Sequence, residues 1–187
     1  MSHNTNIKYL VEAALFAALA MALSFIPDFI SWFSPSYGAI PLIVLALRRG
    51  PKYGLLSGLI WGLLHFALGK IEYLSMSQVV IEYIFAFLSM GLAGLFSKQI
   101  QLQLRQKHLS YAVLIGFSAS FLAIFVRYLF HFIAGVIFWG SYAPKGMSAV
   151  WYSFTVNGTA GFLTLLLVMI SLAILIPAQP QFFSPKD

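Results

Sequence analysis

Long apolar segments dominate this sequence and restrict what it can fold into. Of its 187 residues, 60% are hydrophobic and only 9% are charged, whereas soluble domains carry about 25% charged residues. Several of the apolar segments approach the length of about 20 residues that a helix needs to cross a bilayer. The sequence therefore predicts an all-α integral membrane protein, with one membrane domain over residues 1–187 and contacts with membrane lipid.

Apolar periodicity predicts six helical segments. We expect them at residues 7–26, 39–47, 53–68, 78–97, 109–138 and 150–176. The second segment is short for a membrane span, because each helical residue rises only about 1.5 Å. We therefore expect it to be tilted, or to be continued by the apolar stretch before it.

The basic residues predict how the six segments are oriented. With six spans, most of the basic residues fall on one side of the membrane: Lys8, Arg48, Arg49, Lys52, Lys98, Arg105, Lys107 and Lys186. The opposite side holds Lys70 and Lys145. Cytoplasmic loops of membrane proteins carry an excess of Lys and Arg, so we expect both termini to be cytoplasmic.

Polar residues within the apolar segments converge on one half of the membrane. Glu82 is expected about one helical turn below the outer surface, and Arg127 and His131 share a helix face because they are four residues apart. The outer half also holds further candidates: Trp61, His65, Trp139, Tyr152 and Asn157. Ionisable groups inside membranes usually face a cavity and mark a substrate path. Since the cytoplasmic half has almost none, the pattern favours an outward-facing pocket over a channel.

The chemistry of these residues suits a flat, polar, cationic heteroaromatic ligand. Aromatic faces attract a cation by about 0.5–2 kcal/mol each and also stack on flat rings. A carboxylate neutralises the charge, and the amide of Asn157 can donate and accept at a ring edge. The loop after the first segment is unusually apolar, and its Trp32 and Tyr37 could cover such a cavity.

Structural roles remain open for the same residues. Glu82 could pair with Arg127 and hold the helices together, and Arg127 itself is favoured as structural because a cationic ligand would avoid it. Asn157 could make a helix–helix hydrogen bond. Tryptophans near the interface, including Trp139 and Trp32, are often anchors among lipid headgroups.

Small residues form a strip on the first segment. Ala14, Ala18 and Ala22 are four residues apart, which lets another helix approach closely. That helix could belong to this chain or to a second membrane protein. The sequence has no phosphate-binding loop, no nucleophile–base pair, no metal cluster and no cysteine, so we expect neither an enzyme nor a metal or cofactor site. A pocket without an energy source suggests a subunit.

Together these segments resemble a known transporter family. The stretches "EAALFAALAMALSFIPDF", "SGLIWGLLHF", "VVIEY" and "WYSFTVNGT", with the spacing Arg127–His131–Trp139, resemble the thiamine-specific S components of bacterial energy-coupling factor (ECF) transporters. S components are the substrate-binding membrane subunits. The resemblance covers nearly the whole chain and implies a six-transmembrane-helix bundle with both termini inside, in the bacterial plasma membrane.

The resemblance also implies a ligand, a site and partners. The ligand would be thiamine, with Glu82 and Asn157 holding its aminopyrimidine edge. The remaining implied site residues are Trp139 and His131 stacking on the rings, Trp32 closing over the thiazolium, Tyr152 and Trp61 lining the site, and Tyr73 as a lesser candidate. The alanine strip would dock on the coupling membrane subunit, or T component, which two ABC-type ATPases drive.

Three other functions compete with this interpretation. The protein could be an S component for another flat vitamin or for a thiamine precursor. It could be a stand-alone channel or facilitator. It could also be a membrane enzyme that uses Glu82 and His131 for acid–base chemistry, although no nucleophile or metal set accompanies them.

Overall fold

The computed structural model describes residues 2–27 and 33–185, and every regular element in these ranges is helical. The main elements are α1 (Ser2–Leu23), α2 (Ala39–Arg49), α3 (Pro51–Ala67), the α4–α6 run (Met76–Arg105), α7 (Leu109–Phe138), α8 (Ala149–Ala178) and α9 (Pro180–Phe183). The prediction of an all-α protein is confirmed. The described residues contain a short helix, α9, in addition to the expected six segments.

Four of these helices are long and apolar enough to cross a membrane, namely α1, the α4–α6 run, α7 and α8. Helices α2 and α3 have only 11 and 17 residues, so the count of six spans stays a prediction. Helix α2 is buried along most of its length. Every side chain from Leu42 to Leu47 is buried, as expected for a helix that is apolar all round and lies inside a bundle.

The α4–α6 run changes its helical pitch several times. It contains α4 (Met76–Val79), a π-helical turn (Val80–Phe85), α5 (Ala86–Leu88), a 3-10 stretch (Ser89–Phe96) and α6 (Ser97–Arg105). The sequence predicted that this helix ends near residue 97, but it continues to Arg105. The extension is amphipathic and stays helical because Ile100 and Leu104 are buried against the bundle.

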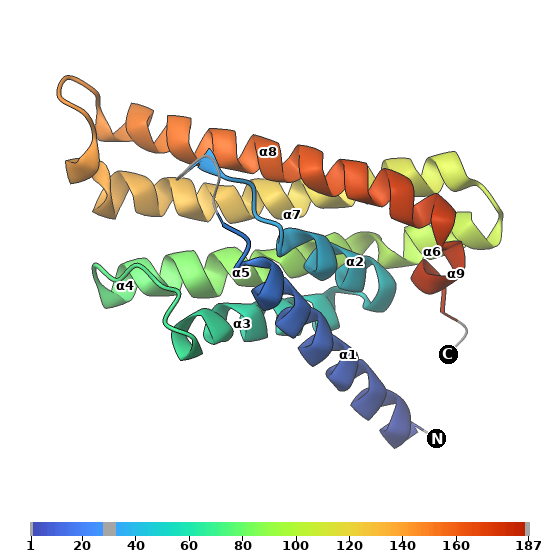
Figure 1. Ribbon diagram of the computed structural model, residues 1–187. Helices are drawn as coiled ribbons and strands as arrows, with labels where there is room; N and C mark the ends of the chain where they lie inside the picture. Colours follow the sequence, from blue (N-terminus) through green and yellow to red (C-terminus); the bar gives the residue numbers. More distant parts are fainter. Residues whose placement is uncertain (1, 28–32, 186–187) are drawn as a thin grey trace.

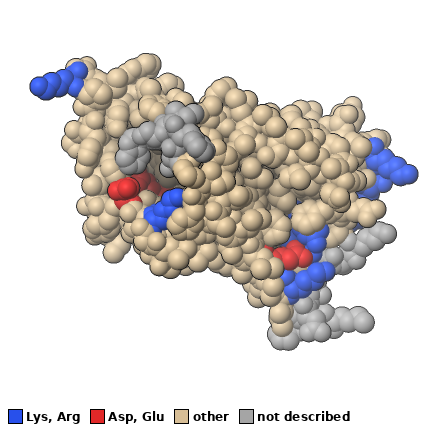
Figure 2. Space-filling model, viewed as in Figure 1, with Lys and Arg blue, Asp and Glu red and all other residues tan. Residues whose placement is uncertain are grey.

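The two ends of the bundle are different. Figure 1 shows α7 and α8 side by side along the length of the molecule, with α1 crossing obliquely over the other helices. Both termini lie at the end that also holds the α2–α3 and α6–α7 turns. The α3–α4 and α7–α8 connections lie at the opposite end. Figure 2 shows a broad uncharged surface between charged side chains at the two ends.

An ionic cluster fixes α1 at the terminal end. The Arg49 guanidinium donates from Nε and Nη2 to the Glu12 carboxylate at 2.6 and 2.7 Å, and Arg48 Nε donates to it at 3.2 Å. Arg48 also donates to the carbonyl of Phe182 in α9. The cluster therefore joins α1, α2 and α9. The bidentate Arg49–Glu12 pair also fixes the position of α1 relative to α2, because such pairs have strict geometry.

Glycines allow α3 to lie directly against the backbone of the α4–α6 run. A Cβ atom on Gly62 would overlap the carbonyl oxygen of Tyr83, and one on Gly58 would overlap that of Phe87. Small residues at such positions permit close helix approach in membranes. The consequence for the site is that α3 and the turn carrying Glu82 have a fixed separation.

We expect Gly62→Ala to destabilise the protein by about 1–3 kcal/mol, because the new methyl group meets rigid backbone instead of a flexible side chain. Thermal unfolding in detergent measures this loss. The control is Gly158→Ala in α8, where a Cβ would meet nothing within 4 Å. Equal melting temperatures for the two variants would contradict the proposed backbone contact.

Candidate binding pocket

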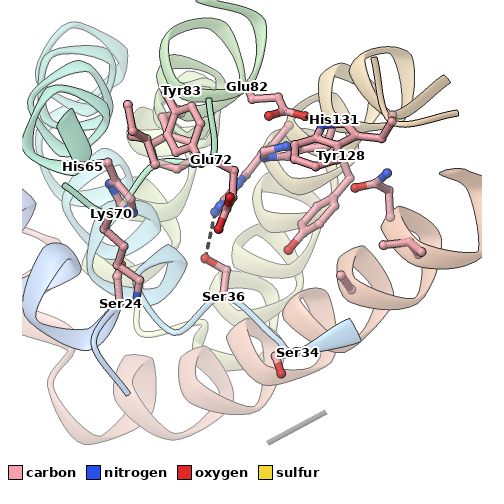
Figure 3. Close-up of a pocket in the computed structure, with 18 of the residues that line it drawn as sticks. Ser24, Ser34, Ser36, His65, Lys70, Glu72, Glu82, Tyr83, Tyr128 and His131 are labelled. Atoms are coloured by element: carbon pink, nitrogen blue, oxygen red, sulfur yellow. Dashed lines mark hydrogen bonds between the residues drawn. The ribbon is translucent and has the colours of Figure 1, made fainter. Parts of the chain in front are cut away.

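A cavity of about 730 Å³ lies at the end of the bundle that holds the α3–α4 and α7–α8 connections (Figure 3). Its walls come from the segment before α2, from α3, from the π-helical turn, and from α7 and α8. Ligand pockets for small molecules typically have volumes of about 300–1,000 Å³. The cavity therefore has room for a vitamin-sized molecule.

Most of the residues selected from the sequence line this one cavity. They are Trp61, Glu82, His131, Trp139, Tyr152 and Asn157. Trp32 lies outside the described residues. Tyr73 is 62% exposed and is absent from the cavity lining. The structure thus brings together side chains from α3, the α4–α6 run, α7 and α8.

The Glu82 carboxylate is held by two donors from different parts of the chain. Trp139 Nε1 donates to Oε1 at 2.8 Å, and the Gln78 amide donates to Oε2. Glu82 is only 8% exposed, and no described cation lies within ion-pair distance of it. The alternative of a direct Glu82–Arg127 pair is therefore not present. A carboxylate has about four acceptor positions, so this one can still accept from a ligand.

Arg127 interacts with aromatic faces and with the segment before α2. Its guanidinium carbon lies 4.7 Å from the centre of the Trp61 ring and 4.8 Å from that of Phe87. Its Nη1 donates to Ser36 Oγ at 3.1 Å. These contacts fit the structural role that the sequence favoured for Arg127, since they join α7 to α3 and to the first connection.

A hydrogen-bond network extends from this first connection to α8. The Ser36 backbone N–H donates to Thr164 Oγ1 at 2.9 Å, and the Tyr128 hydroxyl shares a hydrogen bond of 2.8 Å with the same oxygen. The network therefore fixes the wall of the cavity beside α2. It leaves the aromatic ring of Tyr128 against His131, with ring centres 5.6 Å apart.

Trp61 forms part of the cavity floor. Its ring stacks on Phe87 at 4.2 Å between centres, and its Nε1 donates to Ser24 Oγ at 3.1 Å. Only 1% of Trp61 is exposed, so it offers a small area of its ring to a ligand. His65, one turn later, donates from Nδ1 to the Trp61 carbonyl at 2.9 Å.

The sequence analysis missed several lining residues. Tyr83, Tyr128, Lys70 and Glu72 line the cavity as well. Tyr128 could have been found, because it lies three residues before His131 and shares its helix face. Tyr83 could not, because adjacent residues of an α-helix point in different directions. Helical spacing does not reveal the π-helical turn that brings Tyr83 to the same cavity as Glu82.

Comparison with known proteins relates this fold and cavity to one family. The sequence model of the family described as "Thiamine transporter protein" matches residues 10–184. The chain belongs to this family. The thiamine transporter ThiT of Lacticaseibacillus paracasei is 36% identical over 192 residues, covering 100% of this chain and 96% of that protein. ThiT of Bacillus subtilis is 31% identical over 185 residues, covering 97% and 96%.

A solved structure gives the same result for the fold. The structure of ThiT from Listeria monocytogenes superimposes with a TM-score of 0.93 at 42% identity, covering 97% of this chain and 100% of that one. The family resemblance inferred from the sequence motifs is therefore confirmed. As a member of the thiamine transporter protein family with four apolar membrane-spanning helices, the chain is a multi-pass plasma-membrane transport protein and not an enzyme.

In this family member, the alanines of α1 lie on two faces, one buried and one formed by the exposed strip. Ala13, Ala17 and Ala20 are fully buried against the rest of the chain. Ala14 and Ala18, by contrast, are exposed, as is Ala22. Packing within the chain thus accounts for the buried face only, and the exposed strip is free to contact another helix.

Proposed function

We propose that this protein is the thiamine-binding S component of an ECF-type vitamin uptake transporter. The observation that supports it most directly is Glu82. Its carboxylate is buried at a vitamin-sized cavity, is held by two hydrogen-bond donors and has no cationic partner among the described residues. Family membership supports the same ligand.

The chemistry of thiamine complements the cavity residues. Its aminopyrimidine carries an exocyclic amine that can donate to Glu82. Asn157 donates through Nδ2 to the Ser153 carbonyl and hydroxyl at 3.2 and 3.1 Å. Its Oδ1 has no partner among the described residues, so it can accept a hydrogen bond from the aminopyrimidine ring. Trp139 and His131 then offer aromatic surfaces for stacking.

Electrostatics orient the thiazolium cation. A cation about 4 Å from a carboxylate gains about 4 kcal/mol at an effective dielectric constant of about 20. The like charge of Arg127 is directed towards Ser36 and the faces of Trp61 and Phe87. Glu82 therefore favours a ligand with a positive charge, whose aminopyrimidine edge lies at the carboxylate and whose thiazolium lies beyond it. Trp32 would complete the site from the first connection, and Tyr152 and Trp61 would form its sides.

The orientation we propose puts the cavity on the outer side. Arg48, Arg49, Lys52, Arg105 and Lys107 belong to the α2–α3 and α6–α7 turns, at the end where both termini lie (Figure 1). The positive-inside rule assigns this end to the cytoplasm. With α2 and α3 as short additional spans, the chain crosses the membrane six times and captures thiamine from outside.

The exposed face of α1 is the proposed docking surface for the T component. Ala14, Ala18 and Ala22 offer a smooth strip on a membrane-spanning helix, and small residues at this spacing favour close helix packing. Two ABC-type ATPases would act through that subunit, which explains why this chain has no nucleotide-binding loop of its own.

We expect thiamine to quench the tryptophan fluorescence of the purified protein with saturation, and Glu82→Gln to weaken binding by about ten- to hundred-fold. A hydrogen bond to a charged group contributes about 1.5–3 kcal/mol, which corresponds to such a factor. Titration in detergent measures both dissociation constants. Tyr111→Ala, at the exposed start of α7 near the α6–α7 turn, is the control and should leave affinity unchanged.

A competition experiment distinguishes thiamine from its pyrimidine and thiazole fragments as the ligand. Free pyrimidine and free thiazole alcohol should displace thiamine only at much higher concentrations, because each engages only part of the cavity. Absence of quenching by thiamine would refute the ligand assignment. Equal affinity of wild type and Glu82→Gln would refute the role of Glu82.

We expect Ala18→Leu to abolish co-purification with the T component and the ATPases while thiamine affinity stays at the wild-type value. The bulky side chain projects from the exposed strip, away from the cavity. Ala173→Leu, on the exposed side of α8, is the matched control and should leave assembly intact. Normal assembly of the Ala18 variant would exclude this face as the docking surface.

A further inference from the structure

Gln78 uses all the polar atoms of its side chain beside the cavity. It is fully buried and lies one turn before Glu82. Its Oε1 accepts from the Leu74 backbone N–H at 3.2 Å. Its Nε2 donates to the Glu72 carbonyl at 3.0 Å and also to the Glu82 carboxylate.

These partners fix the orientation of the amide. An amide oxygen cannot donate and an amide nitrogen cannot accept, so a flipped Gln78 would put its oxygen against the Glu72 carbonyl and the Glu82 carboxylate. Both contacts would then be repulsive, and the Leu74 N–H would lose its acceptor. One orientation alone therefore satisfies Leu74, Glu72 and Glu82 together.

We propose that Gln78 is a positioning residue that fixes the Glu82 carboxylate for the ligand and links it to the α3–α4 connection. This inference rests on the proposed function, in which Glu82 contacts thiamine. Gln78 itself is absent from the cavity lining, so it acts through Glu82 and not through a ligand contact of its own.

The geometry explains why a second donor is needed. Trp139, at the end of α7, fixes one oxygen of Glu82, but a single hydrogen bond leaves the carboxylate able to rotate about it. The donor from Gln78 comes from the same helical run and removes that freedom. Preorganised polar groups bind more tightly because less freedom is lost when the ligand arrives.

The same amide holds the edge of the cavity. The α3–α4 connection, residues 68–75, is attached to the helical run by two hydrogen bonds with the Gln78 side chain and by one from the Glu72 N–H to the Tyr83 hydroxyl at 2.9 Å. Glu72 and Glu82 both line the cavity (Figure 3). A change in the position of Gln78 is thus transmitted to both the ligand carboxylate and the loop.

A double-mutant cycle tests the proposal. Gln78→Glu has nearly the same shape but replaces the donor that faces Glu82 with an acceptor, so thiamine binding should weaken about ten- to hundred-fold. In a Glu82→Gln background, the new amide at position 82 can donate to the carboxylate at 78. The same Gln78→Glu change should then weaken binding no more than a few-fold.

The cycle distinguishes positioning from packing. If Gln78 only fills space, the two substitutions act additively, and additive losses would overturn the proposal, as would unchanged affinity in Gln78→Glu. Gln101→Glu is the matched control: its Nε2 donates to the Arg48 carbonyl at 3.0 Å at the other end of the same helical run, and thiamine affinity should not change. Thermal unfolding of each variant shows that it is folded.

A measurement without ligand separates this inference from the proposed function. Gln78→Met removes the acceptor for Leu74 and the donor for Glu72 while keeping the length of the side chain. Hydrogen–deuterium exchange at residues 72–74 should then become faster, whereas Gln101→Met should leave it unchanged. If wild type fails to bind thiamine, the proposed function is wrong. Unchanged exchange in Gln78→Met would overturn the link to the α3–α4 connection.

Discussion

The unfavourable free energy of a carboxylate in hydrocarbon is the constraint on which this structure depends. A charged residue at the centre of a membrane helix is unfavourable by about 2.5–3.5 kcal/mol, even when it can reach water. Glu82 is accommodated because it faces a cavity and because Trp139 and Gln78 donate to its two oxygens. Trp139 follows α7, and Gln78 lies one turn before Glu82, so α7 and the α4–α6 run must meet where the carboxylate lies.

Close backbone packing determines where that meeting point is. Gly62 allows α3 to touch the carbonyl of Tyr83, within the π-helical turn that carries Glu82. A π-helical turn inserts an extra residue and shifts the side chains after it around the helix axis. The helical run can therefore direct Glu82 and Tyr83 to one cavity while Phe87 still stacks on Trp61 below it. The geometry of the site is thus a result of helix packing.

The sequence predicted the helices and the grouping of polar residues, but not the local geometry of the site. Segment lengths and helical spacing were sufficient to group Glu82, His131 and Asn157 in one half of the membrane, and all three line one cavity in the structure. The role of Gln78 was beyond sequence reasoning, because it depends on a loop that folds back over the helix. The extension to Arg105 and helix α9 were missed because both are short and are stabilised by tertiary burial, of Ile100 and Leu104 in the first and of Phe183 in the second.

The two glutamates within membrane-spanning helices have different surroundings, which suit one to a structural role and the other to the proposed ligand binding. Glu12 is compensated by Arg48 and Arg49 in an ionic cluster, so its charge is already balanced and contributes to holding α1. Among the described residues, Glu82 receives neutral donors and no ion-pair partner, so the proposed function assigns the balancing charge to a cationic ligand. A ligand that supplies this charge stabilises the folded state by mass action. The proposed selectivity for a cationic ligand thus follows from the neutral surroundings that the described residues give Glu82.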